Sequence, residues 1–467
     1  MSRQRAYLAA AIIATGTLLR CLGIRGDFWL DEIWSYDIAR SLTSPLQILT
    51  AVHHDNNHYL NTFFLYELGE QAVWQVYRIP ALLAGIAALA VGFVVACRYG
   101  SVEGLIATLL LAVSYPLVHY SSEARGYSFA VLFALTSLGA WRRIPSPVGA
   151  GWALAFAVSA CLGVVSHLVF LLVLPGFALS ALLRVQRRGA RAGVLSTLAL
   201  AVPAALVLWL WRTTLSKTEI GGAPDQSISA AIVQALSCAA GGPDRGAIAI
   251  AVCGAALAIV STGIALLTRE SAEEAAVVGP AFALPAALLW WQQPDFAYLR
   301  YFILSISFAL LAAAVCLGWL WRRGGAWRLL AAALLMLTLA GNLSHVVSFL
   351  RTGRGDYSGT LRYAVEHSDG PRVTFTGDHA FRNTTVLRFY ARRLATERDL
   401  VYVDIAELPP EGADWMLLHR FDDSPIAGEV TDRRGNRYHL ERRAEFYGLS
   451  GWTWHLYRRA PADQRRP

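Results

Sequence analysis

Eleven apolar runs, each close to the length that a helix needs to cross a bilayer, dominate the sequence between residues 5 and 349. A membrane-crossing helix takes about 20 mainly apolar residues, and only 16% of this chain is charged. The sequence therefore predicts an α-helical polytopic membrane protein with about 11 transmembrane helices. The predicted spans are 5–24, 80–97, 102–119, 127–141, 149–165, 168–183, 192–211, 247–267, 275–291, 301–321 and 329–349.

Arginine gathers in the short loops on one side of these spans. Lys217 is the only lysine, so nearly all the basic charge is arginine. Cytoplasmic loops are enriched in Lys and Arg. We therefore expect a cytoplasmic N-terminus and, after an odd number of spans, an extracytoplasmic C-terminus. The net charge of +8 reflects this topology and does not indicate a nucleic-acid partner.

Two of the predicted outer loops are long. The first covers about residues 25–79, and residues 36–50 and 60–77 in it have the mixed periodicity of helices that lie on a membrane surface. The second covers about residues 212–246 and has Gly-Pro-Asp turn signals around an apolar middle at 228–236. We expect this second loop to act as a mobile flap.

The composition changes sharply after Leu350. We divide the chain into a membrane domain, 1–350, and a small extracytoplasmic α/β domain, 352–460. Residues 357–367 and 381–393 have helical patterns. The predicted strands are 372–376, 400–405, 414–419 and 452–457.

An acidic pair, Asp31 and Glu32, follows the first predicted span, between the large aromatic residues Trp29 and Trp34. A carboxylate at a membrane interface can serve as a general base. The alternative is an acidic pair that stabilises the start of a helix through the helix dipole. We take both residues as candidate catalytic residues.

The first outer loop also holds His53, His54, Asp55, Asn57 and His58. A metal site is conceivable from this composition, but adjacent histidines do not face one point on a helix and no cysteine accompanies them. We expect Asn57 and His58 to hydrogen-bond to a substrate.

Arginines next to tyrosines stand where later predicted spans meet the outer face. Arginine grips phosphate with two parallel hydrogen bonds, and an ionisable residue at that depth is a candidate functional residue. The alternative is an arginine that reaches the lipid headgroups. His167, in an apolar outer turn, is more typical of a structural polar residue. The candidate substrate-binding residues at this face are Arg78, Glu123, Arg125, Tyr127, Arg300 and Tyr301.

Taken in order, these motifs resemble the GT-C class of integral-membrane glycosyltransferases, and in it the bacterial family-39-like group related to protein mannosyltransferases. The resemblance covers roughly residues 1–350. The motifs are Leu30-Asp31-Glu32, Asn56-Asn57-His58-Tyr59-Leu60-Asn61-Thr62, Arg78-Ile79-Pro80, Glu123-Ala124-Arg125-Gly126-Tyr127, Ser166-His167 and Arg300-Tyr301.

The resemblance implies a glycosyltransferase of the cell envelope, in the inner (cytoplasmic) membrane. Its donor would be a sugar on a polyprenyl phosphate, with Arg125 and Arg300 on the phosphate and Asp31 as the base in an inverting displacement. It implies no cofactor and leaves a divalent metal open. Many members have His-Pro-Pro-Leu in the first outer loop, whereas this chain has His58-Tyr59-Leu60. That departure leaves the acceptor (protein, lipid or glycan) undetermined.

Two other classes compete with this interpretation. A lipid or solute transporter predicts ionisable residues at mid-membrane and a repeat of two halves. In this sequence the candidate residues cluster at one predicted face, and no repeat is evident. A sensor whose C-terminal domain binds a ligand would leave Asp31 without a role.

Overall fold

The computed structural model describes residues 3–219, 221, 227–294, 297–394, 396–421 and 425–461. The chain divides into two compact units. The membrane unit comprises Met1–Ile24, Ile38–Gly69 and Val76–Val347. The C-terminal unit comprises Arg25–Asp37, Glu70–Gln75 and Ser348–Pro467. The C-terminal unit therefore contains two short segments from the first predicted outer loop.

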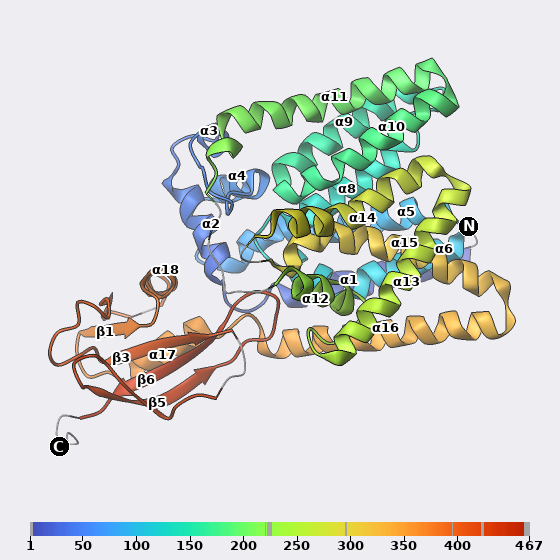
Figure 1. The fold of residues 1–467 in the computed structure, drawn as a ribbon. Helices are drawn as coiled ribbons and strands as arrows, with labels where there is room; N and C mark the ends of the chain where they lie inside the picture. The colour runs from blue at the N-terminus through green and yellow to red at the C-terminus, as the bar shows by residue number, and fades with distance from the viewer. Residues whose placement is uncertain are drawn as a thin grey trace. The chain divides into compact units, whose positions relative to one another are not determined.

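Each predicted span falls on a helix or, in one case, on a bent pair of helices (Figure 1). Within the described residues, nine helices are long and apolar enough to cross a membrane, and the bent pair raises the number to ten. The remaining run is a shorter apolar helix of 15 residues, α8. The helices are α1 (Arg3–Gly23), α5 (Ile79–Ala96), α6 (Ser101–Val113), α7 (Tyr115–Ser121), α8 (Tyr127–Trp141), α9 (Gly149–Ser166), α10 (Leu174–Arg188), α11 (Ala190–Thr213), α13 (Ala247–Glu270), α14 (Ala272–Gln292), α15 (Ile303–Arg323) and α16 (Gly325–Thr352).

The predicted span 102–119 is not one straight helix, because α6 and α7 meet at a bend of 59°. Pro116 has no N–H, so the carbonyl of Ala112 loses its helical partner. Arg20 replaces that partner: its Nη1 donates to Ala112 O and its Nη2 to Leu111 O, each at 3.0 Å. The bend turns the chain just before it reaches Arg125.

Asn342 of α16 provides a partner for another backbone group freed at this bend. The N–H of Tyr115 donates to Asn342 Oδ1 at 2.7 Å. The amide nitrogen of Asn342 donates in turn to the carbonyls of Ala239 and Thr338, at 3.2 and 2.9 Å. Backbone polar groups must be satisfied inside a membrane protein, and buried side chains do so here.

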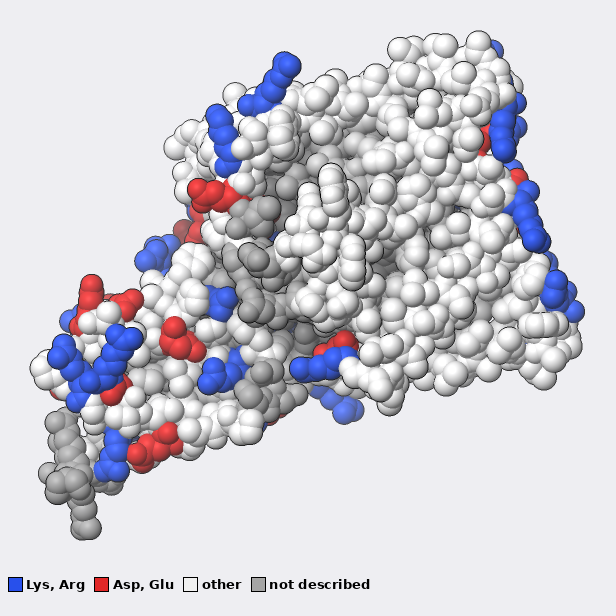
Figure 2. Space-filling view, in the orientation of Figure 1, with Lys and Arg blue, Asp and Glu red and all other residues white. Residues whose placement is uncertain are grey.

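Ion pairs to two buried carboxylates stabilise one end of the membrane unit. Arg184 and Arg188 both donate to Glu273, through Nε, at 2.9 and 2.7 Å. Glu103, which is also buried, pairs with Arg322. Figure 2 shows basic side chains along this end, near the loops that join α10 to α11 and α15 to α16, beside a wide surface without charge. This is the charge distribution that the predicted arginine-rich loops require.

The first outer loop is largely helical. Residues 36–50 contribute to two helices, which Ser44-Pro45 separates as the sequence indicates, and the first of these helices begins earlier than predicted, at Leu30. The predicted helix 60–77 is also two helices. The elements are α2 (Leu30–Ser41), α3 (Gln47–Thr50), α4 (Tyr59–Leu68) and the 3-10 helix η1 (Trp74–Arg78).

The second outer loop pairs with the first. His54 and Glu219 form a parallel β-bridge, in which Asp55 N–H donates to Glu219 O and Glu219 N–H donates to His53 O, each at 3.0 Å. The predicted apolar middle is helix α12 (Ile228–Ala239). The expected flap includes residues 220 and 222–226, which lie outside the described residues, so its mobility stays a prediction.

The C-terminal unit contains a six-stranded sheet in the order β2-β1-β3-β6-β5-β4. Strands β2, β1 and β3 are parallel, and the remaining pairs are antiparallel. Trp415, Trp454 and Tyr357 are among its largest fully buried side chains. The elements are α17 (Tyr357–Glu366), β1 (Arg372–Gly377), α18 (Ala380–Ala391), β2 (Asp399–Tyr402), β3 (Trp415–Arg420), β4 (Glu429–Thr431), β5 (Arg437–Ala444) and β6 (Thr453–Arg459).

The four predicted strands correspond to β1, β2, β3 and β6, whereas β4 and β5 were not predicted. Strand β5 reads Arg-Tyr-His-Leu-Glu-Arg-Arg-Ala. Its charged residues conceal the alternation that marks a strand. A β-bulge between Leu440 and Arg442 disturbs that alternation further.

Candidate functional site

Polar side chains from separate segments of the membrane unit meet around Arg125. We call Asn56, His58, Arg125, Tyr127 and His167 the Arg125 cluster. His58 is the residue before α4, Arg125 lies in the turn between α7 and α8, and Tyr127 is the first residue of α8. His167 joins α9 to the 3-10 helix η2 (Leu168–Leu172). The ends of these helices therefore determine the geometry of the cluster.

Hydrogen bonds determine which atoms of His58 and Arg125 face each other. The N–H of Gly126 donates to His58 Nδ1 at 2.9 Å. An uncharged ring whose Nδ1 accepts carries its proton on Nε2. Arg125 Nη1 donates to Asn56 Oδ1, and Arg125 Nη2 lies 3.4 Å from His58 Nε2. Two hydrogen-bond donors thus lie side by side, an arrangement that favours an acceptor shared between them.

The second histidine adds to this set of donors. The His167 ring centre is 4.3 Å from that of His58 and 4.5 Å from that of Tyr127. The N–H of Val169 donates to His167 Nδ1 at 3.1 Å. By the same argument, the neutral His167 ring is protonated at Nε2.

Burial and two arginines keep both histidines uncharged. Burial lowers the pKa of His58 well below its usual value, and the charges of Arg125, His167 and Arg300 add to the effect. Burial, followed by Arg125 and Arg300, lowers the pKa of His167 to about 3. The positive charge of this region therefore resides on the two guanidinium groups, and the imidazoles contribute neutral donors.

Gly126 allows the helices to approach closely at this point. A side-chain carbon on Gly126 would lie 2.0 Å from the carbonyl oxygen of Ser166 and 3.1 Å from His58 Cβ. The space is taken by the end of α9 and by the histidine itself. Any larger residue would push His58 away from the backbone N–H that orients it.

Arg300 and Tyr301 lie in the 3-10 helix η4 (Leu299–Phe302), which leads into α15. The Arg300 guanidinium stacks 4.1 Å from the centre of the Tyr298 ring. Its charge acts on both histidines of the Arg125 cluster. Tyr301 N–H donates to Tyr298 O at 3.1 Å. Arg300 is therefore a second cation within electrostatic range of the cluster.

The Asp55 carboxylate lies within electrostatic range of Arg125. Burial opposes its ionisation, but the hydrogen bond from His54, the N–H of Gly221 and the charge of Arg125 together lower the pKa of Asp55 below its usual value. The distances are 2.9 Å to His54 Nδ1 and 3.3 Å to Gly221 N. Asp55 therefore ties the two outer loops together beside the Arg125 cluster.

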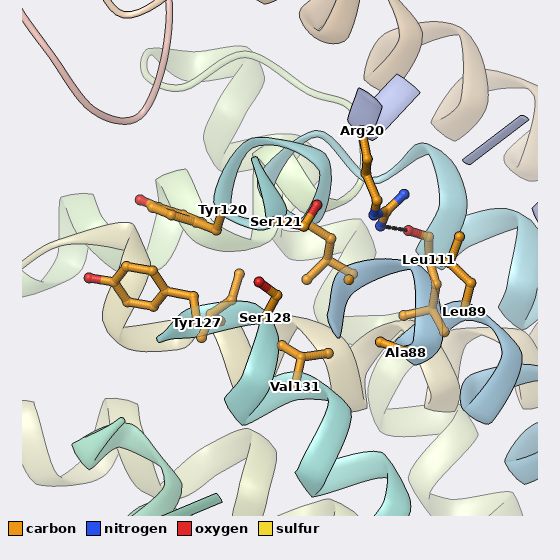
Figure 3. A pocket seen from close by; sticks show the side chains of 12 residues that line it. Arg20, Ala88, Leu89, Leu111, Tyr120, Ser121, Tyr127, Ser128 and Val131 are labelled. Atoms are coloured by element: carbon orange, nitrogen blue, oxygen red, sulfur yellow. Dashed lines mark hydrogen bonds between the residues drawn. The ribbon is translucent and has the colours of Figure 1, made fainter. Parts of the chain in front are cut away.

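A small cavity, of about 20 Å³, adjoins the cluster at Tyr127. Figure 3 shows the Tyr127 and Tyr120 rings at one side of the cavity and the Arg20 guanidinium at the other. Ser128, Leu89 and Val131 also line the cavity. Its lining is largely apolar.

Two other candidate residues donate to backbone carbonyls of distant residues. Asn57 Nδ2 donates to Ile48 O at 2.8 Å, which ties the first outer loop to itself. Arg78 is fully buried, and its Nη1 donates to Ile24 O, at the end of α1, at 2.9 Å. These contacts give both side chains structural partners, and their role in substrate binding stays a prediction.

Glu123 pairs with His119 one helical turn earlier. The distance from Glu123 Oε1 to His119 Nε2 is 3.0 Å, and both side chains are completely buried. This pair lies next to Arg125 in the chain, and the Arg125 N–H donates to the Glu123 carbonyl at 2.8 Å. The Glu123 carboxylate thus stabilises the turn that presents Arg125.

Asp31 and Glu32 lie at the start of α2, within the C-terminal unit. Glu32 is completely buried, and its Oε2 accepts a hydrogen bond from the Trp29 N–H at 3.4 Å. That contact is the one expected of an acidic residue that stabilises a helix start. Asp31 is only half-buried. Of the two carboxylates, Asp31 is therefore the more accessible.

Sequence reasoning gave Asn56 no role of its own and treated His167 as a structural polar residue. In the structure His167 is both a helix cap, through Val169, and a member of the Arg125 cluster. Asn56 stands two residues before His58, just before the start of α4. That position in the sequence is the signal that could have identified it.

The described residues contain no group of three or more His, Cys, Asp or Glu side chains arranged to hold a metal ion. His54 and Asp55 pair with each other.

Comparison with solved structures gives matches over nearly the whole chain. ArnT from Cupriavidus metallidurans in the apo state has a TM-score of 0.55 and 13% sequence identity, over 99% of this chain and 98% of that chain. The crystal structure of ArnT bound to undecaprenyl phosphate has a TM-score of 0.54 and 12% identity, over 99% of each chain. No protein-family model and no curated protein sequence matches the chain. The chain therefore has a GT-C-like fold, and the assignment to the family-39-like group stays a prediction from the sequence motifs.

Proposed function

We propose that this protein transfers a sugar from a polyprenyl-phosphate donor to an acceptor hydroxyl at the outer face of the cytoplasmic membrane. One observation carries the proposal: Arg125 Nη2 and the protonated Nε2 of His58 lie 3.4 Å apart as neighbouring donors. A phosphate oxygen can accept from both. The neighbouring ArnT structure with bound undecaprenyl phosphate supports the same class of donor.

The two arginines would bind the phosphate of the donor. The leaving group of the reaction is a phosphate anion, and arginine stabilises the negative charge that develops on it. Neutral His58 and His167 would donate hydrogen bonds without adding charge, so release of the product is not hindered by excess attraction.

Asp31 would deprotonate the acceptor hydroxyl. A direct displacement inverts the anomeric carbon and needs one base and one site for the leaving group, without a second, nucleophilic carboxylate. Because Glu32 is buried and bonded to Trp29 N–H, we assign it to holding the start of α2 and assign the proton transfer to Asp31.

The predicted topology is part of this proposal. A cytoplasmic N-terminus and an extracytoplasmic C-terminus place the arginine-rich loops inside and the candidate residues outside. The relationship to the family-39-like group rests on the sequence motifs alone. The acceptor stays undetermined.

Binding of undecaprenyl phosphate to the detergent-solubilised protein tests the donor site. Replacing Arg125 with Gln removes charged hydrogen bonds of about 1.5–3 kcal/mol, so we expect roughly 10- to 100-fold weaker binding. Arg125→Lys keeps the charge but loses the fork of donors, and its loss should be intermediate. Thermophoresis of the labelled protein gives the dissociation constants.

Arg323→Gln is the matched control, because Arg323 ends α15 and stacks on Trp319 at 3.9 Å, outside the Arg125 cluster. Arg300→Gln provides a second test if Arg125→Gln fails to fold. Unchanged affinity for undecaprenyl phosphate in both Arg125→Gln and Arg300→Gln would show that the phosphate does not bind at this site.

A further inference from the structure

The segment that carries Asp31 belongs to the C-terminal unit, although it is far from that unit in sequence. Asp27, just before α2, accepts two hydrogen bonds from Ser358 of α17. They come from the Ser358 N–H at 2.6 Å and from its hydroxyl at 3.0 Å. Asp27 is nearly completely buried. A buried carboxylate with two donors is a strong and directional anchor.

Helix α18 contacts the same segment next to this anchor. The hydroxyl of Tyr390 donates to the carbonyl of Phe28 at 2.9 Å, and Tyr390 is completely buried. The Phe28 ring stacks on Phe389, with ring centres 5.6 Å apart and an interplanar angle of 16°. The chain is therefore held at positions 27 and 28, immediately before Asp31.

A second set of contacts lies after Asp31. The Trp34 ring meets Phe381 edge-on at 5.0 Å, and the Tyr36 ring meets Phe389 at 5.7 Å. Arg393 lies over the Tyr36 ring at 5.2 Å. Edge-to-face aromatic pairs are worth about 0.5–1.5 kcal/mol beyond their buried area.

These contacts bracket Asp31 on both sides. Residues three apart on a helix share a face, so Asp31 lies above the face on which Trp34 packs against α18. Rotation of the first turns of α2 about the helix axis would break the hydrogen bond at Phe28 and the edge-on contact of Trp34 together.

Helix α18 is itself fixed to the sheet. The indole N–H of Trp454, in β6, donates to Asn383 Oδ1 of α18 at 3.1 Å. A side chain at Gly377, in β1, would lie 2.4 Å from the amide nitrogen of Asn383. Helix and sheet are therefore in direct contact, and the rigidity of the sheet extends to α18.

We propose that the C-terminal unit is a positioning device for the catalytic base. Ser358, Phe389 and Tyr390 act as positioning residues that hold α2 so that the Asp31 carboxylate has one orientation. This inference rests on the proposed function for the role of Asp31. The contacts described above join residues within the C-terminal unit, so the positioning can be measured separately from transfer.

Tyr390→Phe tests the proposal, because it removes the hydroxyl that bonds Phe28 O and keeps the ring. Tyr363→Phe is the matched control: Tyr363 also belongs to the C-terminal unit, and its hydroxyl donates to Glu441 at 3.0 Å, in contact with β5 and not with α2. Hydrogen–deuterium exchange of the full-length protein in detergent reports on the amides of residues 30–36.

The loss of one buried hydrogen bond of about 1 kcal/mol should speed that exchange by about fivefold in Tyr390→Phe and leave it unchanged in Tyr363→Phe. In the transfer reaction kcat should fall by a similar or larger factor, while the affinity for undecaprenyl phosphate stays within about twofold of wild type. A merely structural role would lower the folded fraction and leave kcat per folded molecule unchanged.

Asp27→Asn weakens the hydrogen bonds between Ser358 and residue 27. It should have the same two effects, faster exchange in α2 and a lower kcat. Wild-type exchange in α2 for both Tyr390→Phe and Asp27→Asn would overturn the positioning role. Faster exchange with unchanged kcat in an active enzyme would overturn its link to catalysis. If the wild-type protein transfers no sugar at all, the proposed function fails, whereas the exchange data still decide whether the C-terminal unit holds α2.

Discussion

Burial decides the charge of individual residues in the Arg125 cluster. His58 and His167 are uncharged because burial and the nearby arginines disfavour a further positive charge. A sequence can predict that His58 and Arg125 belong to one site, but the protonation state depends on which backbone N–H groups face the rings. Gly126 and Val169 supply these groups.

The lowered pKa of His167 predicts that the protein becomes less stable in acid. The folded pKa of about 3 lies below the unfolded value of about 6.5. The unfolded state therefore binds more protons, and stability that is fully present above pH 6.5 is lost as pH falls toward 3. Between pH 6.5 and 5.5 the loss is on the order of 1 kcal/mol.

His167→Asn removes this titration. We expect a smaller drop in unfolding temperature between pH 7.5 and 5.5 for this variant than for wild type, measured by differential scanning fluorimetry in detergent. His367→Asn, at an exposed position, should keep the full wild-type drop. An equal drop in wild type and His167→Asn would contradict the assignment.

At the scale of elements, the break between α6 and α7 is the feature that the apolar pattern could not predict. A run of apolar residues gives the length of a span, but whether Pro116 kinks or ends a helix depends on partners for the freed carbonyls. Arg20 of α1 donates to those carbonyls, and Asn342 of α16 accepts from the freed N–H of Tyr115. An arginine inside a predicted span would by default be a functional candidate, whereas Arg20 contacts backbone carbonyls.

Arg20→Met should therefore destabilise the protein. It leaves the carbonyls of Leu111 and Ala112 without the donors seen here, each worth about 1–3 kcal/mol when buried. We expect a clear fall in unfolding temperature in detergent, against little change in Arg328→Met, whose side chain is exposed. A wild-type unfolding temperature in Arg20→Met would show that the bend does not depend on Arg20.

At the scale of the whole molecule, the sequence predicted the helical membrane architecture and most elements of the C-terminal sheet. Periodicity and apolar length are local signals, and they sufficed for α1, α5 and the later spans. The assignment of residues 25–37 to the C-terminal unit could not be predicted, because it depends on contacts such as Asp27 with Ser358 that are more than three hundred residues apart.

The same limit applies to the candidate site. Motif order brought His58, Arg125 and Tyr127 to attention, and the structure places them in one cluster. Asn57 and Arg78 carry equally suggestive side chains, yet they donate hydrogen bonds to the backbone carbonyls of Ile48 and Ile24. Only the three-dimensional partners separate the two groups.

The first measurement is a transfer assay in membranes of the native host, with a panel of radiolabelled polyprenyl-phosphate sugars as donors. It tests directly whether this protein transfers a sugar from such a donor. Wild type and Asp31→Asn are compared in parallel. We expect label to move to an endogenous acceptor with wild type only, while Asp31→Asn still binds undecaprenyl phosphate. Transfer by Asp31→Asn at the wild-type rate would remove Asp31 from catalysis, and the absence of transfer with every donor by folded wild-type protein would contradict the glycosyltransferase proposal.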